Sequence, residues 1–176
     1  MPKNLARLEP FDDDENLRVV VEVPRGSIVK LEYEPKLKGF VVSRCLPLGL
    51  AYAFDWGFIP GTQGGDGDPV DAIALHESTT YPGVILPCRP IGMIEITERK
   101  NGVSRTNNRI VAMPTRNDQL GEFEQIADLP TRLKEELEQF FLNTSFFTGK
   151  KLKLKGWTDG KAARRYIRRA SVSVRR

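Results

Sequence analysis

The 176-residue sequence has few of the residues that form disulfides or Cys/His metal sites, namely two cysteines and one histidine. Cys45 and Cys88 show neither a metal-ligand spacing nor a disulfide framework, so we interpret both as reduced residues of the core. Reduced thiols are typical of the cytoplasm, where we therefore expect the protein to reside. The single histidine, His76, matches no functional pattern, and we interpret it as an incidental residue of a strand.

Long apolar runs are also missing. No stretch reaches the roughly 18 residues that a membrane span needs, and the first ten residues, MPKNLARLEP, contain no apolar segment of a signal peptide. The contents of 40% hydrophobic and 28% charged residues are ordinary for a globular protein. We expect no membrane partner and a single domain over residues 1–176, with a polar lead-in over 1–17.

Charge is distributed unevenly along the chain. From Lys150 onward there are eleven Lys and Arg residues and one acidic residue, Asp159, whereas the first 149 residues have 16 basic and 22 acidic residues. A basic C-terminus is typical of nucleic-acid binding, but this one lacks interleaved aromatics that could stack on bases. We therefore favour a solvated face of a C-terminal helix over 159–171 and do not expect nucleic acid as a partner.

Most of the chain shows patterns of β-structure. Alternating or continuous apolar residues predict strands over 18–27, 27–34, 39–44, 70–77, 83–97 and 109–114. The segment 46–65 is rich in aromatics, Gly and Pro and is predicted to be a long ordered loop. Helical spacing predicts helices over 128–143 and 159–171, the second with Asp159 as N-cap. We expect an α+β fold, mainly β, with a barrel or curved sheet and flanking helices.

Three aspartates are crowded into the segment GGDGDPVDAI, residues 64–73: Asp66, Asp68 and Asp71. Like charges at this spacing repel, and a divalent cation relieves the repulsion. Mg²⁺ takes oxygen ligands and is held by one or two carboxylates together with substrate phosphates. A calcium EF-hand loop is excluded because Val70 occupies a ligand position and Asp71 stands where the loop needs Gly. A solvated Asp-Gly turn remains an alternative for the segment taken alone.

A series of motifs accompanies this cluster in a fixed order. The sequence resembles the compact, magnesium-dependent family of soluble inorganic pyrophosphatases from about residue 18 to 157, in the segments VVVEVPRGSIVKLEYE, FVVSR, AYAFDWGFIPGT, DGDPVD, CRPIGMIEIT and KLKLKGW. The resemblance implies a five-stranded OB-like closed barrel with flanking helices and several Mg²⁺ ions around pyrophosphate. It also implies a cytoplasmic homo-oligomer, commonly a hexamer in bacteria.

The resemblance further implies roles for individual residues. Asp66 and Asp71 match metal ligands, and Asp68 matches the base that takes a proton from the attacking water. Further positions match supporting acidic residues (Glu22 and Glu32), phosphate-binding cations (Lys30 and Arg44) and a loop tyrosine (Tyr52). Without the resemblance, Lys30 and Glu32 also fit the solvated face of an alternating strand.

The sequence departs from the family pattern at metal positions. Glu98 stands at the position where the family has an aspartate metal ligand, and its extra methylene carries the carboxylate further from the backbone. Asn107 stands at a bridging aspartate, where the amide oxygen can still ligate but one negative charge is lost. Arg109 replaces a substrate-binding lysine, so we expect it to bind phosphate.

A second group of departures concerns the substrate. The Tyr-Lys pair that grips the terminal phosphate in the family falls on Thr144 and Ser145, and Trp56 stands at a second loop tyrosine. Lys150 or Lys151 could substitute for the lost lysine. Each lost charged phosphate contact costs about 1.5–3 kcal/mol of binding.

These features predict a Mg²⁺-dependent phosphoanhydride hydrolase with inorganic pyrophosphate as substrate and a weakened or redirected activity. One alternative is a hydrolase of another phosphorylated substrate. Another is a non-catalytic paralogue that binds phosphate or regulates an active subunit; the retained Asp68 argues against it, since binding alone needs no base. Acidic residues at the cleft centre argue against nucleic-acid binding.

Overall fold

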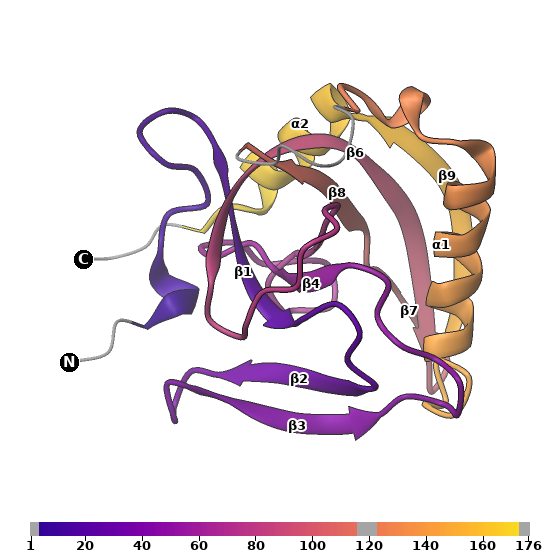
Figure 1. Cartoon of the computed structure of the whole chain (residues 1–176). Coiled ribbons are helices and arrows are strands. Elements are labelled where there is room, and N and C mark those ends of the chain that lie inside the picture. The colour runs from indigo at the N-terminus through magenta and orange to yellow at the C-terminus, as the bar shows by residue number, and fades with distance from the viewer. Residues whose placement is uncertain (1–3, 116–122, 173–176) are drawn as a thin grey trace.

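The computed structural model describes residues 4–115 and 123–172 (Figure 1). In chain order the elements are η1 (Leu5–Arg7), β1 (Leu17–Val23), β2 (Val29–Glu34), β3 (Gly39–Cys45), β4 (Asp55–Phe58), β5 (Asp71–Ala74), β6 (Ile85–Lys100), β7 (Val103–Thr106), β8 (Arg109–Pro114), η2 (Ile126–Asp128), α1 (Thr131–Thr144), β9 (Lys151–Asp159) and α2 (Gly160–Ala170).

Five strands form a ring in the order β1-β4-β5-β8-β6, which closes because β6 also pairs with β1. The 16-residue β6 is long enough to pair with β1 and β8 in its first part and with β7 and β9 in its last part. The pairing of β6 with β8 shifts register between Pro90 and Gly92, as expected for a proline in a strand. The expected mainly β fold with a five-stranded OB-like barrel is confirmed.

The prediction of a loop over 46–65 was wrong in its second half, because β4 lies there, buried between β1 and β5. Four residues with two aromatics, an aspartate and a glycine carry too little alternation to reveal a strand. Gly57 is needed there because a Cβ would lie 1.9 Å from the carbonyl oxygen of Val20 on β1. The strands β7 and β9, outside the predicted set, extend the sheet along β6.

Alternate residues of the central strands face two separate cores. Ile73 packs in the cluster that includes Leu137 and Phe141 of α1, whereas Ala72 packs in the cluster that includes Ala163 and Ile167 of α2. The two predicted helices therefore cover the two faces of the curved sheet (Figure 1). No helix among the described residues is long and apolar enough to cross a membrane.

The C-terminal helix α2 begins as predicted, because the Asp159 side chain accepts a hydrogen bond from the Ala162 amide at 2.7 Å. Part of the basic face of α2 forms contacts with the N-terminal segment. Arg168 donates to the Glu15 carboxylate at 2.7 Å and lies over the Phe11 ring, 5.3 Å from its centroid. The lead-in around Phe11 and Glu15 is thereby held against α2.

Two minor predictions were also wrong. Cys88 is buried as expected, but Cys45 is exposed at the end of β3. His76 lies just beyond β5 and is not incidental: its Nε2 is 3.0 Å from the buried Asp55 carboxylate, to which Thr80 also donates. Burial opposes ionisation of Asp55, but these hydrogen bonds and one from the Arg25 amide hold its pKa below the usual range.

Candidate active site

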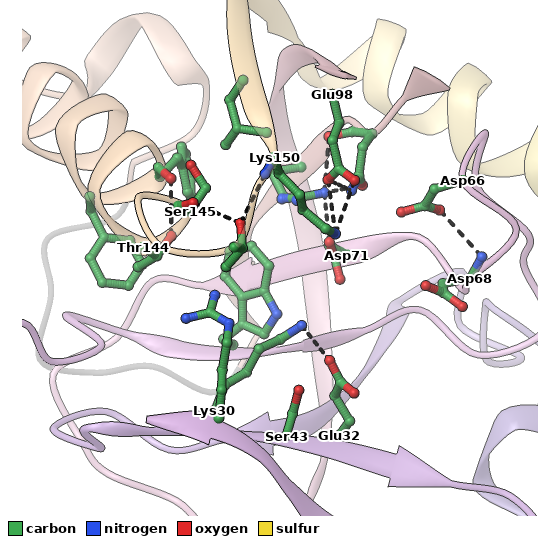
Figure 2. Close-up of a pocket in the computed structure, with 18 of the residues that line it drawn as sticks. Lys30, Glu32, Ser43, Asp66, Asp68, Asp71, Glu98, Thr144, Ser145 and Lys150 are labelled. Carbon is green, nitrogen blue, oxygen red and sulfur yellow. Dashed lines mark hydrogen bonds and ion pairs between the residues drawn. The ribbon is translucent and has the colours of Figure 1, made fainter. Parts of the chain in front are cut away.

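The predicted functional residues converge on a cleft of about 280 Å³. The β2–β3 hairpin, which forms a separate two-stranded sheet, closes one side, and the end of α1 closes another (Figure 2). The sequence-predicted residues that line the cleft are Lys30, Glu32, Arg44, Tyr52, Asp66, Asp68, Asp71, Glu98, Asn107 and Arg109. Segments from across the chain thus form a single polar cleft.

The aspartate cluster lies on the turn before β5. Gly67, with φ at +98°, lets the chain reverse, and the Asp68 amide donates to Asp66 Oδ1 at 3.3 Å. Burial, and then the charges of Asp71 and Asp68, raise the pKa of Asp66. Neither Asp66 nor Asp68 forms an ion pair with any described residue. This turn therefore brings together two carboxylates, those of Asp66 and Asp68, that no described residue pairs with directly.

Asp71 begins β5 and differs from its two neighbours, because Arg109 Nη1 lies 2.6 Å from its Oδ2. The parallel pairing of β5 with β8 places Asp71 opposite Arg109. Burial raises the pKa of Asp71 although Arg109 acts in the opposite direction. An ion pair in this setting holds both side chains at the mouth of the barrel.

The hairpin supplies cations from the facing side. Lys30 on β2 is paired in register with Arg44 on β3, so both reach the cleft from the same strand pair. Lys30 Nζ lies 2.6 Å from Glu32 Oε1. Burial opposes ionisation of Glu32, but Lys30, together with Ser43 and the charge of Lys150, lowers the pKa. The predicted phosphate-binding and acidic residues of the hairpin thus adjoin one another.

Glu22 is the predicted site residue that does not line this cleft. It is buried on β1 and lines an adjoining cavity of about 230 Å³ that Lys30, Asp68 and Asp71 also border. Its Oε1 accepts from the Tyr33 amide at 2.7 Å. Burial raises the pKa of Glu22 to about 7, although this hydrogen bond acts in the opposite direction. Glu22 therefore lies close to Asp68 and Asp71 but in the adjoining cavity, not in the main cleft.

At the far end of the cleft, Glu98 on β6 is neutralised. Lys150 Nζ lies 3.0 Å from Glu98 Oε1, and the Asn107 amide donates to Glu98 Oε2 at 3.3 Å. Burial opposes ionisation of Glu98, but Lys150, together with the Asn107 hydrogen bond and the charge of Arg109, lowers the pKa. Asn107 in turn accepts from Arg109. Sequence reasoning weighed Lys150 only as a substitute for a lost lysine, because the partner of Glu98 lies 52 residues away.

Thr144 and Ser145 line the cleft at the end of α1, on the side opposite Asp66 and Asp68 in Figure 2. Their hydroxyls donate to backbone carbonyls one turn earlier, at 3.0 Å and 2.8 Å. The hydroxyl hydrogens are thus used within the helix end. Neither residue replaces the charge of a lysine.

Two aromatic residues, Tyr52 and Trp56, line the cleft. Tyr52 and Trp56 are buried and pack edge to face, with ring centroids 6.0 Å apart. Burial raises the pKa of Tyr52, so its hydroxyl stays protonated at neutral pH. Arg109 lies over the Trp56 ring, 5.2 Å from its centroid. The Trp56 Nε1–H is the one buried side-chain polar atom without a hydrogen-bond partner among the described residues.

The donors of the cleft suit a cation held jointly with a ligand. Among the described residues no group of three or more His, Cys, Asp and Glu side chains is placed to hold a metal by itself. Mg²⁺ does not need such a cage, because it keeps several waters and uses one or two carboxylates plus phosphates. The carboxylate of Asp66, which no described residue pairs with, fits this requirement, and Asp68 and Asp71 lie in the same cleft beside it.

Comparisons with known proteins agree with this geometry. The family model described as inorganic pyrophosphatase matches residues 19–175. The inorganic pyrophosphatase of Thermus thermophilus is 34% identical over 157 residues, covering 88% of this chain and 87% of that protein. The inorganic pyrophosphatase of Gluconobacter oxydans is 32% identical over 176 residues, covering 98% and 99%.

Solved structures give the same result. The crystal structure of the inorganic pyrophosphatase from Thermus thermophilus superposes with a TM-score of 0.87 at 32% identity, covering 96% of this chain and 97% of that one. Both the sequence match and the fold extend over almost the whole chain. This chain belongs to the inorganic pyrophosphatase family.

Proposed function

We propose that this protein hydrolyses inorganic pyrophosphate to two phosphates in a Mg²⁺-dependent reaction. The observation that carries the proposal is the cleft in which Asp66 and Asp68, free of ion pairs with described residues, face the cations of the β2–β3 hairpin. Such a site suits a substrate that is itself anionic and brings a divalent cation with it. The relatives described above carry the same activity in their names.

Asp66 and Asp71 are the residues that would hold Mg²⁺, with Glu22 and Glu32 supporting the ions from further out. Asp66 has the required open oxygens, and Asp71 lies across the turn from it. When bound, Mg²⁺ lowers the pKa of water and offsets the charge of the phosphates. The raised pKa of Asp66 reflects the unfavourable crowding that a cation would relieve.

Asp68 is the residue that would take the proton from the attacking water. It is exposed to the cleft and its carboxylate forms no ion pair with a described residue, so it can accept a proton and release it to solvent. Tyr52, which lines the same cleft, stays neutral and can donate a hydrogen bond.

Lys30, Arg44 and Arg109 would bind the phosphates. Lys30 and Arg44 project from paired positions of the hairpin, which fixes their spacing. Arg109 is held by Asp71 and by the Trp56 ring, so its guanidinium is oriented before substrate binds. Preorganised cations of this kind stabilise the charge that develops on the leaving phosphate.

We also infer a cytoplasmic homo-oligomer, with a hexamer as the expected state, formed from a single domain. These inferences rest on the resemblance of the sequence to the family. Size-exclusion chromatography with light scattering decides the oligomeric state, because a hexamer and a monomer differ sixfold in mass.

The direct test is phosphate release with Mg²⁺ from pyrophosphate, tripolyphosphate and a nucleoside triphosphate. We expect pyrophosphate to be the preferred substrate. Asp68→Asn should lower kcat by about 10²- to 10⁴-fold without unfolding the protein. The control is Asp13→Asn, the same change at an exposed residue outside the cleft, which should leave kcat unchanged. The proposal fails if folded protein releases no phosphate, and a preference for another substrate would indicate a redirected activity.

A further inference from the structure

The ammonium of Lys150 contacts the Glu98 carboxylate in the cleft. Its Nζ lies 3.0 Å from Oε1 and 3.1 Å from Oε2 of Glu98, so one ammonium faces both carboxylate oxygens. The Glu98 side chain is 10% exposed and that of Lys150 is 38% exposed. Glu98 is therefore buried, whereas the lysine that contacts it is partly exposed.

Asn107, the other candidate metal ligand beside Glu98, is also hydrogen-bonded within the protein. Asn107 donates through Nδ2 to Glu98 Oε2 at 3.3 Å and accepts through Oδ1 from Arg109. A metal ion needs the lone pairs of its oxygen ligands. Glu98 accepts three hydrogen bonds here, from the Lys150 ammonium at both oxygens and from the Asn107 amide, and Asn107 Oδ1 accepts one from the Arg109 guanidinium. Two fixed positive charges therefore adjoin the lone pairs that remain, and they repel a further cation. Glu98 and Asn107 do not fit Mg²⁺ in this arrangement, in contrast to the sequence-based expectation.

The segment after α1 offers no other positive charge to the cleft. Among the cleft-lining residues from the end of α1 to β9, Lys150 is the single cation, while Thr144, Ser145 and Thr148 are neutral. An ammonium has three N–H donors, and the two contacts of Lys150 Nζ in the structure both go to Glu98. One donor remains for an anion in the cleft.

We propose that Lys150 is a fixed cation that replaces a metal ion at this end of the cleft and binds a phosphate of the substrate, with Glu98 and Asn107 as its positioning residues. The proposal rests on the proposed function for the identity of the anion. It assigns divalent cations to the aspartate turn alone and gives the phosphate nearest α1 to a side chain.

Metal binding is measured without substrate, by counting Mn²⁺ bound per chain with electron paramagnetic resonance. We expect Glu98→Gln to leave the number and affinity of bound Mn²⁺ unchanged, whereas Asp66→Asn, the same chemical change on the aspartate turn, should weaken Mn²⁺ binding by about tenfold or more. Loss of a bound Mn²⁺ in folded Glu98→Gln overturns the proposal, because Glu98 would then be a ligand.

Substrate binding is measured by steady-state kinetics and by calorimetry with inorganic phosphate. Lys150→Gln should raise KM for pyrophosphate and Kd for phosphate roughly 10- to 100-fold, the size of a charged hydrogen bond. Lys150→Arg should recover part of this loss. The matched control is Lys151→Gln, which removes the same charge from the next residue, exposed and outside the cleft lining.

Equal affinities of folded Lys150→Gln and Lys151→Gln would overturn the role of Lys150. The Mn²⁺ count and the phosphate titration need no hydrolysis. An inactive wild type would therefore refute the proposed function, while the two titrations would still decide whether Lys150 replaces a metal and binds phosphate.

Discussion

The two ends of the cleft both contain carboxylates, but their surroundings differ. On the aspartate turn, Asp66 and Asp68 form no ion pair with a described residue, and Asp66 is harder to ionise than a free aspartate. At the other end, Glu98 contacts Lys150 through both oxygens and ionises more easily than a free glutamate. A carboxylate without an ion pair attracts a divalent cation from solution, whereas a carboxylate already paired with a lysine ammonium does so much less.

Under the proposal for Lys150, this difference accounts for the departures from the family pattern that the sequence resemblance implies at Glu98 and Asn107. Glu98, Asn107 and Lys150 form one hydrogen-bonded group, so their side chains make sense together and not one by one. A longer carboxylate reaches the lysine, and the neutral amide avoids a second buried charge beside it. The charge that a metal would supply comes from a side chain.

The largest effect should follow from removing an open carboxylate. Asp66→Asn is expected to raise the Mg²⁺ concentration for half-maximal activity by about 100-fold, because a direct ligand should matter at least as much as groups that only orient ligands. Activity titrated with Mg²⁺ measures the change. A half-maximal concentration equal to that of the wild type would remove the contrast between the two ends.

A smaller effect is expected from converting the fixed-cation end into a metal end. The double substitution Lys150→Gln and Asn107→Asp removes the ammonium and places a second carboxylate beside Glu98. Crowded carboxylates without a cation attract a divalent ion, so the variant should bind one additional Mn²⁺ per chain. Electron paramagnetic resonance provides the count. The single substitution Asn107→Asp is the control, since Lys150 remains; a gain of Mn²⁺ in that variant would contradict the fixed-cation interpretation.

The smallest effect is expected at the end of α1. The hydroxyls of Thr144 and Ser145 donate to the carbonyls of Phe141 and Leu142, inside the helix terminus. Thr144→Val and Ser145→Ala should therefore change KM for pyrophosphate by less than about threefold, since lost neutral hydrogen bonds contribute little. Steady-state kinetics gives the value, and circular dichroism checks the helix. A tenfold rise in KM would mean that these hydroxyls contact substrate and that Lys150 does not act alone.

The sequence predicted the barrel well where strands show alternation or apolar runs, as in β1, β2 and β8. It failed at β4 because four residues are too few for a pattern, and at β7 because four exposed residues resemble a loop. The alternating lysines and leucines at the start of β9 do show a strand pattern, which the prediction overlooked. Cys45 was misplaced because a cysteine gives no sign of the face on which a strand end lies. His76 could be recognised only through Asp55, which β4 buries against it.

The sequence by itself determined the aspartate turn. Asp66, Asp68 and Asp71 lie within six consecutive positions, so local chain geometry brings their charges together in any fold that keeps the turn. Only the tertiary structure decided the other end of the cleft. Glu98 and Lys150 are 52 residues apart, and they meet because β9 pairs with the second half of β6. Contacts at that separation depend on the packing of the whole sheet, and no local pattern of residues encodes them.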